Sequence, residues 1–287
     1  MPPRLFSAGW RSWCATHRDG APTSTYHDGV STLRQQALAV LLATDPWRKA
    51  ALARDLDPSD GVGAGAAIAE PAGIPGRPAR PAMVPHTEVP QRSVKSPEGL
   101  AALMHALAHI EFNAINLAVD IAWRFAGMPD AFYLDWMKVA REEAYHFGLL
   151  GDRLVELGFA YGDFPAHDAL WTMAEKTRHD LLARIALVPR TLEARGLDAS
   201  PAIRNKLVSV GDKRGAEILD IILRDEIGHV AIGNHWYGVL CAERGLDPIA
   251  TYAALAEQHG APKLRGPFNL AARRAAGFSE EELLRLG

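Results

Sequence analysis

The sequence has few cysteines, no strong net charge and no long apolar run, and each absence excludes a class of protein. Cys14 and Cys241 are the two cysteines among 287 residues. They are far apart and form no C-x-x-C motif, so neither a disulfide framework nor a thiolate zinc site is indicated. This cysteine usage is typical of the reducing cytoplasm, where we expect the protein to reside.

The charge balance gives no sign of a nucleic-acid or membrane partner. Acidic residues number 34 and basic residues 31, so the formal net charge is -3. A nucleic-acid-binding domain usually carries a basic excess, which argues against such a partner. The longest uncharged helical run, residues 227–242, is shorter than the roughly 20 apolar residues that span a bilayer. We therefore predict no transmembrane segment.

Proline and glycine divide the chain into four parts. Residues 1–56 are expected to form an N-terminal arm and a helix from Ser31 to Leu56, broken at Pro46, which packs on the remainder. Residues 57–96 form an extended connector, because eight of the nineteen prolines lie between residues 57 and 99. From residue 97 onward the apolar residues recur with helical periods and almost no strand alternation. The predicted fold class is all-α.

Four long helices are predicted within residues 97–245, followed by a tail of short helices at 246–287. Capping residues, glycines and prolines give the expected ranges, which are 96–125, 129–157, 165–195 and 212–244. The third of these is expected to bend at Pro189 and to end at Gly196. Helices of this number and length predict a four-helix bundle.

Two Glu-x-x-His pairs are the most informative motif: Glu143 with His146 in REEAYHF, and Glu226 with His229 in RDEIGHV. Residues three apart on an α-helix share a face, so each pair presents a carboxylate and an imidazole together. Apolar residues flank both pairs at helical spacing, which predicts buried faces. Ionised carboxylates are costly there unless they are paired or bind metal. The pairs predict a metal site, and the alternative is two acid–histidine hydrogen bonds in the core.

A bundle site for two metals also needs a glutamate from each of the other two helices. Glu111 lies on an apolar face of the first helix, and a hairpin folded at residues 127–129 places it opposite the first pair. Glu193 is the corresponding residue of the third helix, since Glu111 precedes Glu143 by 32 residues and Glu193 precedes Glu226 by 33. The alternatives on that helix are Glu175 and Asp180.

A second acid precedes each pair. A metal-bound histidine usually donates its other ring N–H to a carboxylate, which fixes its tautomer. From the facing helix, Asp225 is placed to serve His146, and Glu142 to serve His229. The alternative is that both acids are solvated residues of helix surfaces.

At these residues the sequence resembles the ferritin-like superfamily of carboxylate-bridged di-iron proteins, whose halves each contribute a Glu and a Glu-x-x-His. RDEIGHV is similar to the fourth-helix segment of the ribonucleotide reductase small subunit and its oxygenase relatives. A wider run over about residues 80 to 280 is similar to an uncharacterised bacterial family of ferritin-like proteins. Its motifs are AHIEFNAINLA, REEAYHFGLL, YGDFPAHDALW, LVPRTLEARGLD and RDEIGHVAIGNHW.

This resemblance implies a ferritin-like bundle that holds two iron ions, with manganese or a mixed pair as alternatives. It further implies an oxygen-activating oxidase or hydroxylase that uses O₂, a small-molecule substrate and an electron donor. Two other classes stay open: an iron-handling protein with ferroxidase or storage activity, and a non-catalytic helical protein stabilised by metal. The added N-terminal helix, connector and tail argue against a dedicated iron cage. A homo-oligomer is compatible with the sequence.

Overall fold

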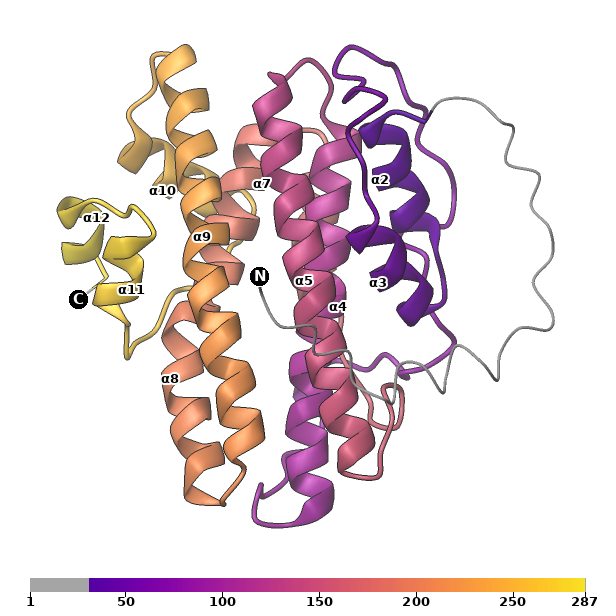
Figure 1. Ribbon diagram of the computed structural model, residues 1–287. Coiled ribbons are helices and arrows are strands. Elements are labelled where there is room, and N and C mark those ends of the chain that lie inside the picture. The colour runs from indigo at the N-terminus through magenta and orange to yellow at the C-terminus, as the bar shows by residue number, and fades with distance from the viewer. Residues whose placement is uncertain (1–30, 287) are drawn as a thin grey trace, which may run out of the picture. The chain divides into compact units, whose positions relative to one another are not determined.

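Figure 1 shows the chain as helices joined by turns and loops, in a computed structural model that describes residues 31–286. The predicted N-terminal arm, with Cys14, lies outside the described residues. All features reported below belong to the compact unit that begins at Thr32. Within the described part of the chain there is no strand, only an isolated bridge between Met83 and Ala166. The all-α prediction is confirmed, and no described helix is long and apolar enough to cross a membrane.

Helices α4 (Pro97–Arg124) and α5 (Asp130–Glu156) form a first hairpin, as their predicted ranges indicated. Ser96 caps α4 by accepting a hydrogen bond from the Gly99 N–H. Gly127 lies in the connecting turn with a φ of 83°, a left-handed backbone that favours glycine. Every residue of α4 from 111 to 123 is buried, so this hairpin forms the centre of the core.

A second hairpin follows. Helix α7 (Leu181–Leu187), the π-helical turn η2 (Val188–Glu193) and α8 (Ala194–Ser209) run on without a break and pack against α9 (Lys213–Glu243). At the start of α9 the Asp212 carboxylate accepts a hydrogen bond from the Gly215 N–H. Helix α9 also contacts α5, so the two hairpins lie side by side (Figure 1).

The third helical segment differs from its prediction at both ends. Instead of starting at residue 165, it is preceded by a separate helix, α6 (Ala169–Lys176), and an interruption at residues 177–180. Asp180 ends that interruption because its carboxylate accepts hydrogen bonds from the Leu182 and Ala183 N–H groups and so caps α7. At the other end the helix does not stop at Gly196 but continues to Ser209.

A distant side chain allows this continuation. Pro201 lies inside α8 and has no N–H to donate to the Leu197 carbonyl, which would normally break the helix. The side-chain amide of Asn269 donates to that carbonyl instead, at 3.2 Å. The helix therefore passes through Pro201 without leaving the carbonyl of Leu197 unsatisfied.

Two helices take the place of the single helix predicted from Ser31 to Leu56. They are α2 (Leu33–Leu42) and α3 (Pro46–Arg54), and the break falls at the predicted Pro46. Thr32, rather than Ser31, caps α2, because its side chain forms a capping box with the first turn. Helix α2 packs on α4 and α3 packs on α5.

Arg34 of α2 holds the first part of the connector. Residues 57–96 are irregular, as predicted, except for the short 3₁₀ helix η1 (His86–Glu88). The Arg34 side chain is buried, and its guanidinium donates hydrogen bonds to backbone carbonyls on two segments. These are the carbonyls of Gly63, Ala64 and Ala66 in the connector and of Ala122 and Trp123 in α4.

Lys49 of α3 forms a second buried tie. Its ammonium donates to the Leu41 carbonyl of α2 at 3.1 Å and to the Gly76 carbonyl of the connector at 2.9 Å. A third hydrogen bond goes to the Asn116 side-chain oxygen on α4. Four parts of the chain therefore meet at one cation.

The tail contains the short helices that were predicted for residues 246–287: α10 (Pro248–Gln258), α11 (Leu270–Ala275) and α12 (Glu280–Leu284). Helix α10 contacts α7 and α9, and α11 contacts α8 and α9 (Figure 1, yellow end). Buried ion pairs hold the tail in place, with Arg190 of η2 paired to Glu282 and Arg273 of α11 paired to Asp198.

Candidate metal centre

The six predicted ligands come from four helical segments that meet in the interior. Glu111 belongs to α4, Glu143 and His146 to α5, Glu193 to the end of η2, and Glu226 and His229 to α9. The exposed fractions are 4% for Glu111, 1% for Glu143, 7% for Glu226 and 0% for both histidines. Glu193 is half-buried, with its Oε2 atom fully enclosed.

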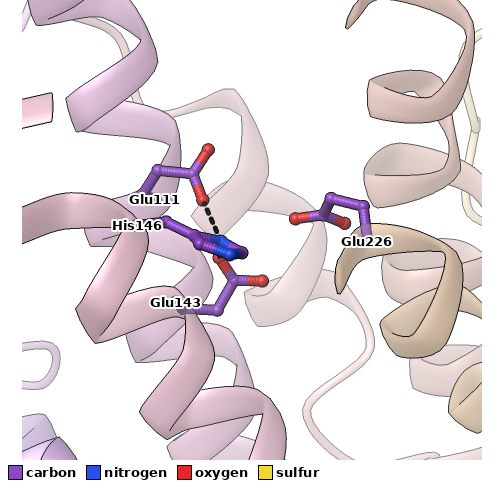
Figure 2. Close-up of side chains that lie close together, drawn as sticks. All are labelled: Glu111, Glu143, His146 and Glu226. Atoms are coloured by element: carbon purple, nitrogen blue, oxygen red, sulfur yellow. Dashed lines mark ion pairs between the residues drawn. The ribbon is translucent and has the colours of Figure 1, made fainter. Parts of the chain in front are cut away.

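Four of these side chains are close enough to share one ion (Figure 2). One ligand atom from each of Glu111, Glu143, His146 and Glu226 lies within 4.8 Å of the other three. The Nδ1 atom of His146 is 3.3 Å from Glu111 Oε2 and 3.5 Å from Glu143 Oε2. In Figure 2, Glu226 faces this group from the opposite side. Two carboxylates of one hairpin and one of the other thus converge beside an imidazole.

Glu143 lies between the two histidines. Its Oε2 atom faces His146, while its Oε1 atom is 2.9 Å from His229 Nδ1. The Nδ1 atom of His229 is also 3.6 Å from Glu226 Oε1, and the two imidazole centroids are 5.9 Å apart. A carboxylate whose two oxygens face different imidazoles has the position expected of a ligand that bridges two ions.

Both histidines turn the same nitrogen toward the centre and the other toward an acid on the facing helix. The Nε2 atom of His146 is 3.1 Å from Asp225 Oδ2, and that of His229 is 2.8 Å from Glu142 Oε2. These are the two pairings predicted from the sequence. In the neutral imidazole the acid holds the proton on Nε2, which leaves the lone pair of Nδ1 pointing inward, as a metal ligand requires.

The inward-facing atoms lack hydrogen-bond partners, which is the observation that tests whether a metal fits. Seven enclosed atoms of the centre have no hydrogen bond to the described residues. They are Glu111 Oε2, both oxygens of Glu143, His146 Nδ1, Glu193 Oε2, Glu226 Oε2 and His229 Nδ1. Buried polar atoms in proteins are nearly always satisfied. Seven exceptions at one place, all of them atoms that can donate a lone pair, fit the ligand shell of bound cations.

Without a cation, protons have to balance the charge of the buried carboxylates. Burial raises the pKa of Glu111, and the neighbouring Glu143 carboxylate raises it further. Burial and nearby carboxylates likewise raise the pKa values of Glu193 and Glu226. Burial alone would lower the pKa of His146, but the carboxylates of Asp225, Glu111 and Glu143 outweigh it and raise the pKa to about 12. A divalent cation would stabilise the ionised carboxylates and the neutral imidazole instead.

Glu193 reaches the interior through η2, an element that the sequence analysis predicted only as a bend. The π turn adds one residue to the helical turn around Pro189 and ends at Glu193. Burial, and then the negative charges of Glu226 and Glu143, raise the pKa of its carboxyl group. Glu193 is not one of the four side chains whose ligand atoms lie within 4.8 Å of one another. Its predicted position near a helix end was wrong, since α8 continues beyond it.

The π turn packs closely against Gly233, where a side chain would clash. The sequence analysis did not identify this residue. A Cβ atom on Gly233 would lie 2.9 Å from Pro189 Cβ, closer than real side chains approach. The available signal was the spacing, because Gly233 follows His229 by four residues and therefore lies one turn further along the same face.

The alternatives to Glu193 have other partners. Glu175 Oε1 accepts a hydrogen bond from the Trp171 Nε1–H at 2.9 Å. Asp180 is the cap of α7. Neither joins the group of buried ligands.

Comparisons with known proteins identify the family. The family model described as "Protein of unknown function (DUF455)" matches residues 42–284. An "Uncharacterized protein" of Haemophilus influenzae is 51% identical to this chain over 213 residues, which covers 72% of this chain and 74% of the relative. No solved structure matches the chain significantly. The chain belongs to the DUF455 family.

Proposed function

We propose that this protein is a ferritin-like di-metal carboxylate protein that holds two iron ions and activates oxygen. In this proposal α4, α5, the α7–η2–α8 segment and α9 form the four-helix bundle, and six of their residues are the ligands. The observation that carries the proposal is the set of seven enclosed, unpartnered donor atoms on those residues. Several of these atoms lie only 2.9–3.5 Å from one another, as the lone-pair donors around a shared cation would.

The ligands divide into two groups around Glu143. His146, Glu111 and one oxygen of Glu143 lie together, and His229 lies with the other oxygen of Glu143 and with Glu226. Glu193 completes the second group. Four carboxylates carry four negative charges, which two divalent cations neutralise. Mixed carboxylate and imidazole donors suit iron and manganese, and the ferritin-like resemblance favours iron.

Bound iron supplies the electrons that reduce O₂, and the chain supplies the surroundings in which this occurs. Asp225 and Glu142 hold the imidazole protons on Nε2, so Nδ1 of each histidine remains a ligand. Burial of the centre keeps water away from the donor atoms. An organic substrate and an electron donor are the further reactants of the proposed oxidase or hydroxylase.

Metal analysis of the purified protein tests the centre. Wild type is expected to bind about two iron ions per chain, and Glu143→Gln to lose both because Glu143 lies in both groups. Glu156→Gln, an exposed acid on the same helix, is the matched control and is expected to keep both ions. A wild type that purifies without metal, binds none on reconstitution and is fully stable would contradict the proposal.

Oxygen consumption separates oxygen activation from iron handling. Protein loaded anaerobically with Fe(II) is expected to take up O₂ in a fixed ratio to its two ions, with no uptake when more Fe(II) is added. Repeated turnover of added Fe(II) with growth of a mineral would instead identify an iron-handling protein and overturn the assignment as an oxidase.

A further inference from the structure

A cleft away from the candidate metal centre lies between η2 and the C-terminal helices. Its volume is about 480 Å³, and residues of η2, α10, α11 and α12 line it. Small-molecule sites commonly measure ~300–1,000 Å³, so the cleft is large enough for an organic ligand. None of the six candidate metal ligands lies on its wall.

The inner wall of the cleft is aromatic and contacts two buried arginines. The Arg190 guanidinium lies 5.5 Å from the Tyr252 ring centroid and 5.3 Å from that of Phe278. Arg273 lies 5.2 Å from the same Phe278 ring. Both arginines are buried, and both are neutralised by the ion pairs that fix the tail. The wall therefore offers flat apolar surface that is already held in position.

The outer part of the cleft carries two cationic side chains that reach solvent. Two of the four cationic side chains that line the cleft, Arg190 and Arg273, are paired with acids, which leaves Lys263 and Arg285 beside Glu257. Lys263 is exposed, and Arg285 is 62% exposed with only a surface pair to Glu281. Exposed pairs of this kind contribute little to stability, so an anion can compete with Glu281 for Arg285.

We propose that this cleft binds an amphipathic organic anion. The apolar or aromatic body of the ligand packs on Tyr252 and Phe278, and its acidic group meets Lys263 and Arg285. Tyr252 is hydrogen-bonded through its hydroxyl to Thr191 Oγ1 of η2 at 2.9 Å. The ligand thus rests against the turn that ends at Glu193. The site does not depend on the presence of metal.

Fluorescence titration with 8-anilinonaphthalene-1-sulfonate, an aromatic anion, tests the proposal. One molecule is expected to bind per chain, and the neutral N-phenyl-1-naphthylamine to bind at least tenfold more weakly. The double variant Lys263→Glu/Arg285→Glu is expected to lose about tenfold in affinity, because two attractive contacts become repulsive. Ala256→Trp fills the cleft from α10 and is expected to abolish binding.

The matched control is Lys206→Glu/Arg244→Glu, which makes the same charge change at exposed positions away from the cleft. It is expected to bind like wild type. Equal losses in both double variants would show a general charge effect and overturn the site, as would binding that survives in a folded Ala256→Trp protein. Equal affinity for the neutral probe would overturn the assignment of an anion.

Discussion

Glu142 and Asp225 determine which nitrogen of each imidazole faces the centre. Both acids are more exposed than the five buried candidate ligands, with side-chain exposures of 30% for Glu142 and 13% for Asp225. They also have cationic neighbours on their own helices, with Lys138 3.7 Å from Glu142 and Arg224 2.8 Å from Asp225. The acids therefore stay ionised and accept the Nε2–H of each histidine. In the proposed centre they would position the candidate ligands without contacting the ions.

We predict that Asp225→Asn and Glu142→Gln each weaken metal binding by about 10- to 100-fold without changing the number of ions at saturation. The amide no longer favours the Nε2–H tautomer, so Nδ1 becomes a poorer ligand. Titration of metal against a competing chelator measures the change. Asp220→Asn, an exposed acid on α9, is the control. Unchanged affinity in both variants would mean that the acids are surface residues with no part in the centre.

At the scale of elements, η2 connects the packing of α9 to the candidate ligand Glu193. Pro189 is seated against Gly233, and Thr191 donates a hydrogen bond to the Ala186 carbonyl at 2.8 Å. The extra residue of the π turn is thus held by contacts on both sides. Turns of this kind are often found at functional sites, where they reorient a side chain.

We predict that Gly233→Ala destabilises the protein by about 1–3 kcal/mol, because the new methyl group must displace Pro189. Metal affinity is expected to fall as well, since Glu193 ends the same turn. Gly238→Ala on the same helix meets no atom within 4 Å and is expected to gain up to about 1 kcal/mol from helix propensity. Urea unfolding measures both. A Gly233→Ala variant as stable as Gly238→Ala would show that η2 shifts freely.

The elements that the sequence predicted well are those with local signals. Ser96 with Pro97, Gly127, and Asp212 each mark a boundary through interactions within a few residues, and the ranges of α4, α5 and α9 follow. The third segment was mispredicted because its continuation depends on Asn269, 72 residues from the carbonyl that it satisfies. A pattern of neighbouring residues contains no trace of that contact.

The candidate site divides in the same way. Each Glu-x-x-His pair shares a face because of helix geometry alone, so the convergence of each pair is predictable from spacing. The pairing of Asp225 and Glu142 with the opposite histidines follows from two helices facing each other. Glu193 is different, because its position near the other candidate ligands depends on the π turn and on Gly233 of another helix. Whether these residues bind iron stays a prediction.

At the scale of the whole molecule, Lys49 joins α2, α3, the connector and α4 through one buried ammonium. Burial lowers its pKa to about 7 from the ordinary value of 10.5, and the charge of Arg77 contributes in the same direction. Between these two values the unfolded chain carries the proton more often than the folded chain does. The free energy of unfolding therefore rises with pH between these two values. The stabilisation that the lowered pKa of Lys49 gives at high pH is lost as the pH falls toward 7.

We predict that wild type gains stability over this pH window, by up to about 1.4 kcal/mol per pH unit, whereas Lys49→Met does not. Urea unfolding of both proteins at several pH values measures the difference between their slopes. Lys206→Met, at an exposed position, is expected to keep the wild-type slope. Parallel profiles for wild type and Lys49→Met would mean that the three acceptors keep the ammonium charged throughout.

Arg34 links segments that are far apart in the sequence. Its guanidinium binds carbonyls that lie 29 to 32 residues away in the connector and 88 to 89 residues away in α4. The α4–α5 and α8–α9 hairpins close over short turns, and such local contacts form quickly, whereas closing a long loop costs more entropy. The guanidinium can leave water only when both sets of carbonyls are in place. We expect α2 and the connector to close last during folding and to open first, with faster amide hydrogen exchange than the α4–α5 and α8–α9 hairpins.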